Sequence, residues 1–172
     1  VAIKSSERNL AREAYLLREL QSCPFVVRLE YEGFYLEKRV VALEWAEGNV
    51  LEAIGEYEDN LCGSSLMFGP VFALIEAMVH LHHMGIAFLD IKPANFLWFQ
   101  TDGSLVMDRF KLCDPELAQR MDNDRLIDDS CCTAVYAPPL RQCSSFSGSK
   151  FDVYCAGITI MCMILRMCDV AG

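Results

Sequence analysis

The order of the apolar segments is the feature that most constrains the fold of this chain. Strand-like runs rich in β-branched residues come first, and the longest helix-like runs come later. The expected strands cover residues 1–4, 26–32, 38–45, 96–99 and 110–113. The expected helices cover residues 8–21, 50–54, 66–84 and 152–167. This order predicts an α+β chain in two unequal lobes, linked by the segment EWAEG at residues 44–48.

Proline and glycine mark the expected ends of these elements. Pro24 ends the helical pattern of residues 8–21, and Gly85 is placed to end the long apolar helix. That helix begins at residue 66, or only after Pro70. A loop at Gly33 between two strand-like runs predicts an antiparallel pair.

Length and charge limit the class of protein. The 172 residues are enough for one domain, and 53% hydrophobic content excludes a disordered tail. A net charge of −9 argues against nucleic acid or an anionic membrane as the main partner. The longest uncharged apolar run near the C-terminus, Val153 to Leu165, is too short to span a bilayer, so we interpret it as part of a buried helix.

The cysteines indicate a reducing environment. There are nine, an odd number, and none form a C-x-x-C pair. This pattern predicts free thiols and a cytoplasmic protein. The histidines His80, His82 and His83 could join a distant cysteine at a zinc site, but the cysteine spacing disfavours this reading.

Phosphoryl transfer needs a cation on the nucleotide phosphates, oxygen ligands for Mg²⁺ and a carboxylate that orients the attacking hydroxyl. The chain offers these residue types in one order. Lys4 could hold phosphates and Glu13 could hold Lys4, while Asp90 could serve as the base. Asn95 and Asp114 could bind the metal. Each residue alone is a weak signal, but the string D-x-K-P-x-N after L-H-x-x-G-I is specific.

Taken together, these motifs resemble the eukaryotic protein kinase family over nearly the whole chain. The matching strings are VAIK, EAYLLREL, VVALEWAEG, LHHMGIAFLDIKPANFL, KLCDPELA and DVYCAGITI. The resemblance implies a partial small lobe at residues 1–43, a hinge at 44–48 and a partial large lobe at 49–172. It implies catalytic roles for Asp90 and Lys92, ATP binding by Lys4, Glu13, Leu43, Glu44 and Ala46, and metal binding by Asn95 and Asp114.

Lys92 resembles the serine/threonine branch of the family. The implied function is transfer of the ATP γ-phosphate to protein serine or threonine, with ATP and Mg²⁺ as cofactors and basic peptides as candidate substrates. The acidic residues between 114 and 139 would favour basic peptides, although a solvated loop explains them equally well. The alternatives are an inactive kinase-fold scaffold, a nucleotide-binding interaction module, or a fragment without a stable fold of its own.

The residues before Asp90 depart from the family pattern. Phe88 and Leu89 stand where the family has His and Arg. The aromatic ring can still pack beneath the metal-binding segment, but the lost Arg is the cation that would pair with a phosphorylated activation loop. We therefore predict that phosphorylation of Ser130 or Thr133 does not switch this domain by that route.

Further departures follow Asp114. Pro115 and Glu116 replace Phe and Gly, so the segment should flip less easily, and Glu116 either adds a metal ligand or points to solvent, which we favour. Leu140 replaces the acid that ends the activation segment.

The small lobe also differs from the family. Lys4 and Glu13 are closer in sequence than usual, so the first turn of the intervening helix is expected to be missing. The family's glycine-rich loop would stand before Val1, so these 172 residues do not include it. If these residues are the whole protein, apolar helix faces should lie exposed, whereas a longer parent could be complete.

Overall fold

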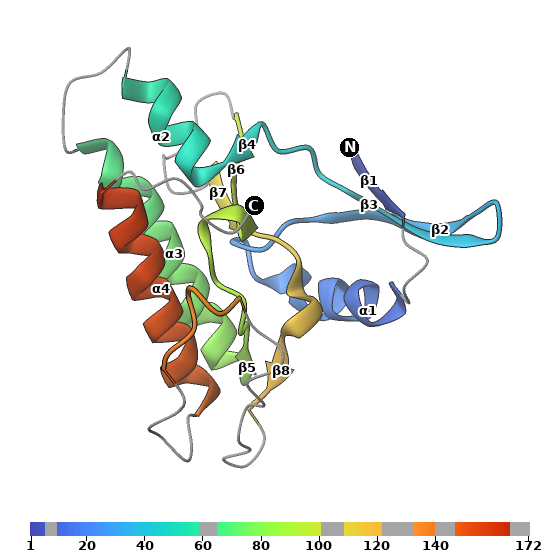
Figure 1. The fold of residues 1–172 in the computed structure, drawn as a ribbon. Coiled ribbons are helices and arrows are strands. Elements are labelled where there is room, and N and C mark those ends of the chain that lie inside the picture. Colours follow the sequence, from blue (N-terminus) through green and yellow to red (C-terminus); the bar gives the residue numbers. More distant parts are fainter. Residues whose placement is uncertain (6–9, 59–64, 101–108, 122–132, 140–146, 166–172) are drawn as a thin grey trace.

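The computed structural model describes residues 1–5, 10–58, 65–100, 109–121, 133–139 and 147–165. It has the predicted mixture of helices and strands. Figure 1 shows a three-stranded sheet and one helix on one side, a pair of long helices on the other, and short strands between them. The first part contains β1 (Ala2–Ser5), α1 (Ala11–Glu19), β2 (Leu29–Tyr35) and β3 (Lys38–Leu43).

The first sheet has the order β1-β3-β2, and both pairs are antiparallel. Lys4 lies opposite Val41 in this register. Val41 packs against Leu10 and Ala14, so α1 covers the face of the sheet to which Val41 contributes. The helical periodicity predicted for residues 8–21 is confirmed over α1, where Leu17 is fully buried.

The hairpin between β2 and β3 turns at a different place from the one predicted. Gly33 lies inside β2, opposite Val40, and the chain turns at Leu36 and Glu37, whose φ angles are 47° and 64°. The Tyr31 ring lies against Gly33, and a Cβ atom there would lie 2.1 Å from the Tyr31 hydroxyl, so a larger residue would make this exposed ring move. The glycine therefore makes room for an aromatic ring rather than forming the turn.

The second part is mainly helical. Its helices are α2 (Val50–Glu58), α3 (Ser65–His83) and α4 (Gly148–Leu165). Its strands are β4 (Gly48–Asn49), β5 (Ile86–Ala87), β6 (Phe96–Trp98), β7 (Phe110–Leu112) and β8 (Gln119–Arg120). They form an antiparallel sheet of order β4-β6-β7 and an antiparallel pair β5-β8. The TDGS segment predicted to turn between β6 and β7 lies outside the described residues.

The ends of the helices have identifiable causes. Asn49 Oδ1 accepts the backbone N–H groups of Leu51 and Glu52 at 2.9 and 3.2 Å, so Asn49 caps the start of α2. The sequence left two possible starts for α3, at residue 66 or after Pro70. The helix begins at Ser65 and contains Pro70, so the earlier start is the one observed. Gly85, at a φ of 70°, follows the end of α3 as predicted.

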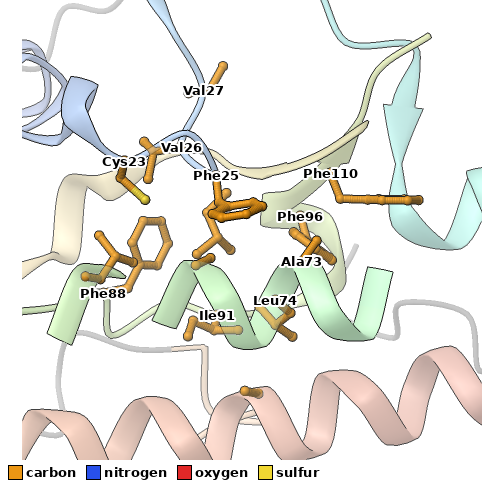
Figure 2. Close-up of a cluster of buried hydrophobic side chains, with 14 of the residues drawn as sticks. Cys23, Phe25, Val26, Val27, Ala73, Leu74, Phe88, Ile91, Phe96 and Phe110 are labelled. Carbon is orange, nitrogen blue, oxygen red and sulfur yellow. The ribbon is translucent and has the colours of Figure 1, made fainter. Parts of the chain in front are cut away.

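Residues 23–27 join the two parts through one buried core (Figure 2). The Phe25 carbonyl accepts the Leu112 N–H at 2.8 Å, and the Leu112 carbonyl accepts the Val27 N–H at 2.9 Å. The rings of Phe25 and His80 meet edge to face, with centroids 5.5 Å apart. Figure 2 shows Phe25, Leu74 and Phe96 gathered around α3, above α4. The segment after α1 is thereby fixed to both α3 and β7.

The helix α4 is one of the long apolar elements. It begins four residues earlier than predicted, since it starts at Gly148 rather than Asp152. Its 18 residues have a mean hydropathy of 1.3, so by length and composition it could cross a membrane, although buried helices of soluble proteins pass the same test. Only one face of α4 is buried, and Val153, Met161 and Ile164 on the remainder are exposed.

Candidate active site

The loop between β5 and β6 brings the predicted catalytic side chains together. Asp90 Oδ2 accepts a hydrogen bond from Asn95 Nδ2 at 2.8 Å and lies 3.0 Å from Lys92 Nζ. Asp90 Oδ1 accepts a hydrogen bond from the Thr133 hydroxyl at 2.9 Å, and Lys92 Nζ donates to the same hydroxyl at 2.9 Å. Only 11% of the Asp90 side chain is exposed. The carboxylate is therefore fixed by three neighbouring groups.

A buried carboxylate on α4 positions this loop. The Asp152 side chain is fully buried, and its two oxygens accept the N–H groups of Phe88 and Leu89, each at 2.8 Å. His82 Nε2 lies 3.0 Å from Asp152 Oδ2. Leu89 has a φ of 67°, a left-handed conformation that a branched apolar residue seldom adopts. The two amide contacts hold Leu89 in this conformation and so turn the chain toward Asp90.

Lys4 links two carboxylates that lie far apart in the sequence. Its Nζ is 2.9 Å from Glu13 Oε2 and 3.0 Å from Asp114 Oδ1. Burial alone would lower the pKa of Lys4, but the hydrogen bonds with Glu13 and Asp114 outweigh it and raise the pKa above 10.5. Burial raises the pKa of Glu13, and Lys4 offsets part of that rise. The predicted Lys4–Glu13 pair is therefore present, and Asp114 joins it.

Asp114 follows β7 in a left-handed conformation, with a φ of 58°. The residue before it, Cys113, donates its backbone N–H to the Asn95 carbonyl at 2.9 Å, so the two residues predicted to bind metal lie on adjoining segments. Pro115 is buried at the start of a 3₁₀ turn, whereas Glu116 is exposed. Glu116 therefore points toward solvent, as we favoured. Burial raises the pKa of the Cys113 thiol to about 12.

The donor types at the candidate metal site suit Mg²⁺. Magnesium prefers oxygen ligands and is often held by one or two carboxylates together with substrate phosphates. Asp114 supplies a carboxylate, 40% of which is exposed, and Asn95 supplies an amide whose Nδ2 is used on Asp90, which leaves its oxygen. Among the described residues, no cluster of three or more His, Cys, Asp and Glu side chains could hold a metal ion. In that part of the chain, His80 and His83 bond to backbone carbonyls within α3.

The hinge residues occupy the connection between β3 and β4. Leu43 is the last residue of β3 and packs against the core, as does Ala46. The Glu44 N–H donates to the Arg28 carbonyl at 3.0 Å, so it is not available to a ligand. Within the described segments, the Glu44 carbonyl and the Ala46 N–H have no hydrogen-bond partner. One acceptor and one donor are what the edge of an adenine ring requires.

The replacements before Asp90 are buried. Phe88 is inaccessible to solvent and belongs to the same core cluster as Leu112 and Ala118, which flank the Asp114 segment. Leu89 is 2% exposed and lines a pocket of about 770 Å³ between α1, β5, β8 and the start of α4. An apolar side chain at this point cannot pair with a phosphate, and the response to phosphorylation stays a prediction.

The structure describes one of three residues named in the predictions for the activation segment. Ser130 and Leu140 lie outside the described residues. Thr133 is described, and its hydroxyl bonds to Asp90 and Lys92 rather than standing apart as a regulatory group.

Sequence reasoning missed the roles of Asp152 and Thr133. Asp152 had a detectable signal, because it is a charged residue at the start of a long apolar helix, and a buried charge must be paired. Thr133 was considered only as a site of phosphorylation, and its sequence neighbours Cys132 and Ala134 give no sign of a contact with Asp90. The contact with Asp90 joins residues 43 positions apart and requires the fold.

The comparisons with known proteins agree with this geometry. The chain is 28% identical over 170 residues to serine/threonine-protein kinase STK11 of Rattus norvegicus, which covers 92% of this chain and 36% of that protein. It is 29% identical over 179 residues to the glycogen synthase kinase-3 homolog YGK3 of Saccharomyces cerevisiae, covering 95% and 46%. It is also similar to the mitosis inhibitor protein kinase mik1 of Schizosaccharomyces pombe, at 28% over 159 residues. The chain thus spans less than half the length of each of these relatives.

The family comparison covers nearly all of the chain. The family model of the protein kinase domain matches residues 1–169, which include every site residue described above. The order of the motifs, the Lys4–Glu13 pair and this match lead to one conclusion: the chain belongs to the protein kinase domain family.

Proposed function

We propose that this chain is the catalytic part of a serine/threonine protein kinase that transfers the γ-phosphoryl group of ATP to a protein hydroxyl. The observation that carries the proposal is the pair of clusters around Lys4 and Asp90. Lys4 contacts both Glu13 and Asp114, and Asp90 is held by Lys92, Asn95 and Thr133. These are the charges and donors that phosphoryl transfer needs, placed by segments that are in direct hydrogen-bond contact.

Each side chain has a distinct task in this proposal. Bound ATP and Mg²⁺ would supply the transferable group and neutralise its charge. Lys4, oriented by Glu13, donates hydrogen bonds to phosphate oxygens, and Asp114 and Asn95 hold the metal. Asp90 orients the substrate hydroxyl and accepts its proton.

Lys92 lies 3.0 Å from Asp90 and stabilises negative charge that develops beside it. The Glu44 carbonyl and the Ala46 N–H would bind the adenine edge, beside Leu43 at the gatekeeper position.

The proposal extends to the organisation of the chain. Residues 1–43 would form part of a small lobe and residues 49–172 part of a large lobe, with 44–48 as the hinge. Basic serine or threonine peptides are the proposed substrates, because acidic residues predominate between residues 114 and 139. A reducing, cytoplasmic location is proposed because the nine cysteines are odd in number and include no C-x-x-C pair, and because the described Cys23 and Cys113 are free thiols.

A second candidate is a nucleotide-binding scaffold that no longer transfers phosphate. It is favoured by the Pro115–Glu116 pair, since Pro115 is buried at a fixed φ and restricts movement of the segment that carries Asp114. In that case Lys4 and Asp114 would still bind nucleotide, while Asp90 would have no chemical role.

Transfer of labelled γ-phosphate to a mixture of basic serine and threonine peptides separates the two candidates. The wild-type chain, in its parent protein if it has one, is compared with Asp90→Asn and with Glu30→Gln, a control on the outer side of β2. Transfer that is lost in Asp90→Asn and kept in Glu30→Gln supports the kinase. Equal background from all three, with ADP binding that Lys4→Met weakens, supports the scaffold.

A further inference from the structure

An ion pair outside the clusters described above connects the hinge to β7. Lys111 Nζ lies 2.7 and 2.8 Å from the two carboxylate oxygens of Glu44. The side chains are only 18% and 12% exposed, respectively. Lys111 Nζ also lies 5.1 Å from the centre of the Phe99 ring, which favours a cation. A pair this well enclosed has a defined geometry, unlike exposed pairs, which contribute little.

Glu44 is fixed at nearly all its polar atoms. Its Oε1 accepts the Arg28 N–H at 2.6 Å as well as the Lys111 ammonium, and its own N–H donates to the Arg28 carbonyl at 3.0 Å. In the described part of the chain, its carbonyl is the remaining polar group. The side-chain contacts therefore set the direction of the backbone carbonyl that the proposed function assigns to adenine.

The other end of the pair leads directly to the metal-binding segment. Lys111 is the middle residue of β7, and Leu112, Cys113 and Asp114 follow it. Leu112 is bonded on both sides to the segment around Phe25, and Cys113 is bonded to Asn95. Movement of Lys111 along the strand direction would therefore be transmitted to Asp114, because few of the intervening groups can absorb it.

We propose that Glu44 and Lys111 are positioning residues that keep the adenine-binding hinge and the Asp114 segment in register. This inference rests on the proposed nucleotide-binding function and adds two residues to it. Neither side chain touches the reacting groups in this assignment. Loss of the Lys111 charge frees Glu44 to rotate and misdirects its carbonyl, so binding of the base weakens even though the hinge sequence is unchanged.

The test compares wild type with Lys111→Met, Lys111→Arg and Glu44→Gln. Dissociation constants for adenosine and for Mg²⁺·ADP are measured by calorimetry at a temperature where circular dichroism shows every variant to be folded. We expect Lys111→Met and Glu44→Gln to weaken adenosine binding roughly 5- to 20-fold, the lower part of the range of about 5- to 150-fold that is typical of coupled sites. Lys111→Arg should restore the Kd to within about twofold of wild type, since a guanidinium can also bind both oxygens of Glu44.

The matched control is Arg18→Met, which removes an exposed ion pair between α1 and Glu32 and should leave both dissociation constants unchanged. If wild type binds adenosine and Lys111→Met binds it with the same dissociation constant, the positioning role is refuted. If wild type binds neither ligand, the proposed function is wrong, and amide hydrogen exchange then decides the inference by itself. Faster exchange in Lys111→Met at both the Glu44 N–H, which is bonded to Arg28, and the Cys113 N–H, which is bonded to Asn95, upholds the coupling of the two segments, whereas unchanged exchange at either one refutes it.

Discussion

Replacing Asp152 with asparagine is expected to loosen the turn that carries Asp90. The buried carboxylate accepts the amides of Phe88 and Leu89 at 2.8 Å each. Asparagine keeps one acceptor oxygen but turns its NH₂ group toward the other amide, so one buried N–H loses its partner. A hydrogen bond to a charged group contributes about 1.5–3 kcal/mol, and a buried donor left unpaired costs about 1–3 kcal/mol. We therefore expect the free energy of unfolding to fall by about 2–4 kcal/mol, a large share of the 5–15 kcal/mol typical of a domain.

Urea denaturation of wild type and Asp152→Asn measures this difference directly, provided that both proteins show the same slope of unfolding free energy against urea concentration. Glu30→Gln is the control, because Glu30 forms an exposed pair with Arg28 and its loss should cost less than about 0.5 kcal/mol. Native-state hydrogen exchange should become faster at the amides of Phe88 and Leu89 before it does in α3. A loss of stability below about 1 kcal/mol, or unchanged exchange at these two amides, would show that Asp152 does not hold the turn.

Three further predictions concern single groups in the site. Thr133→Ser should keep phosphate transfer within about fivefold, whereas Thr133→Glu should abolish it, because a second carboxylate would then stand beside Asp90; peptide phosphorylation by the three proteins tests this. The Cys113 thiol, with its pKa raised to about 12 from 9.0, should react with iodoacetamide at pH 8 about thirtyfold more slowly than a free peptide thiol, as followed by peptide mass spectrometry. The pKa of Lys4 is raised above 10.5, so its stabilising effect should be fully present below pH 10.5 and lost as the pH rises through the folded-state pKa; the stability difference between wild type and Lys4→Met should shrink across that range and not before it.

The overall fold could be predicted from the sequence because its elements depend on local patterns. Apolar spacing placed α1 and α3, and β-branched runs placed β1 and β3. The error at Gly33 has a physical reason: a glycine that makes room for Tyr31 has the same local signature as a glycine in a turn. The actual turn at Leu36 and Glu37 carries no glycine, so residue preferences could not locate it.

The candidate site was predictable only in part, for a different reason. Lys4, Glu13 and Asp114 were identified by motif, and their contacts bring together residues up to 110 positions apart. The partners that arise purely from the fold were missed, such as Lys111 on Glu44 and Thr133 on Asp90. A surface lysine and a loop threonine are common in any sequence, so only their three-dimensional neighbours distinguish them.

The departures from the family pattern remove side-chain interactions but not the backbone conformations on which the site depends. A left-handed conformation costs a residue such as Leu89 about 1–2 kcal/mol, yet Leu89 retains it with a φ of 67° because Asp152 binds its N–H. Asp114 is also left-handed, with a φ of 58°, and Lys4 holds its carboxylate. The groups that set both turns lie outside the altered positions. We therefore predict that Leu89 forfeits pairing with a phosphate without displacing Asp90, and that the domain holds its site in place without being phosphorylated.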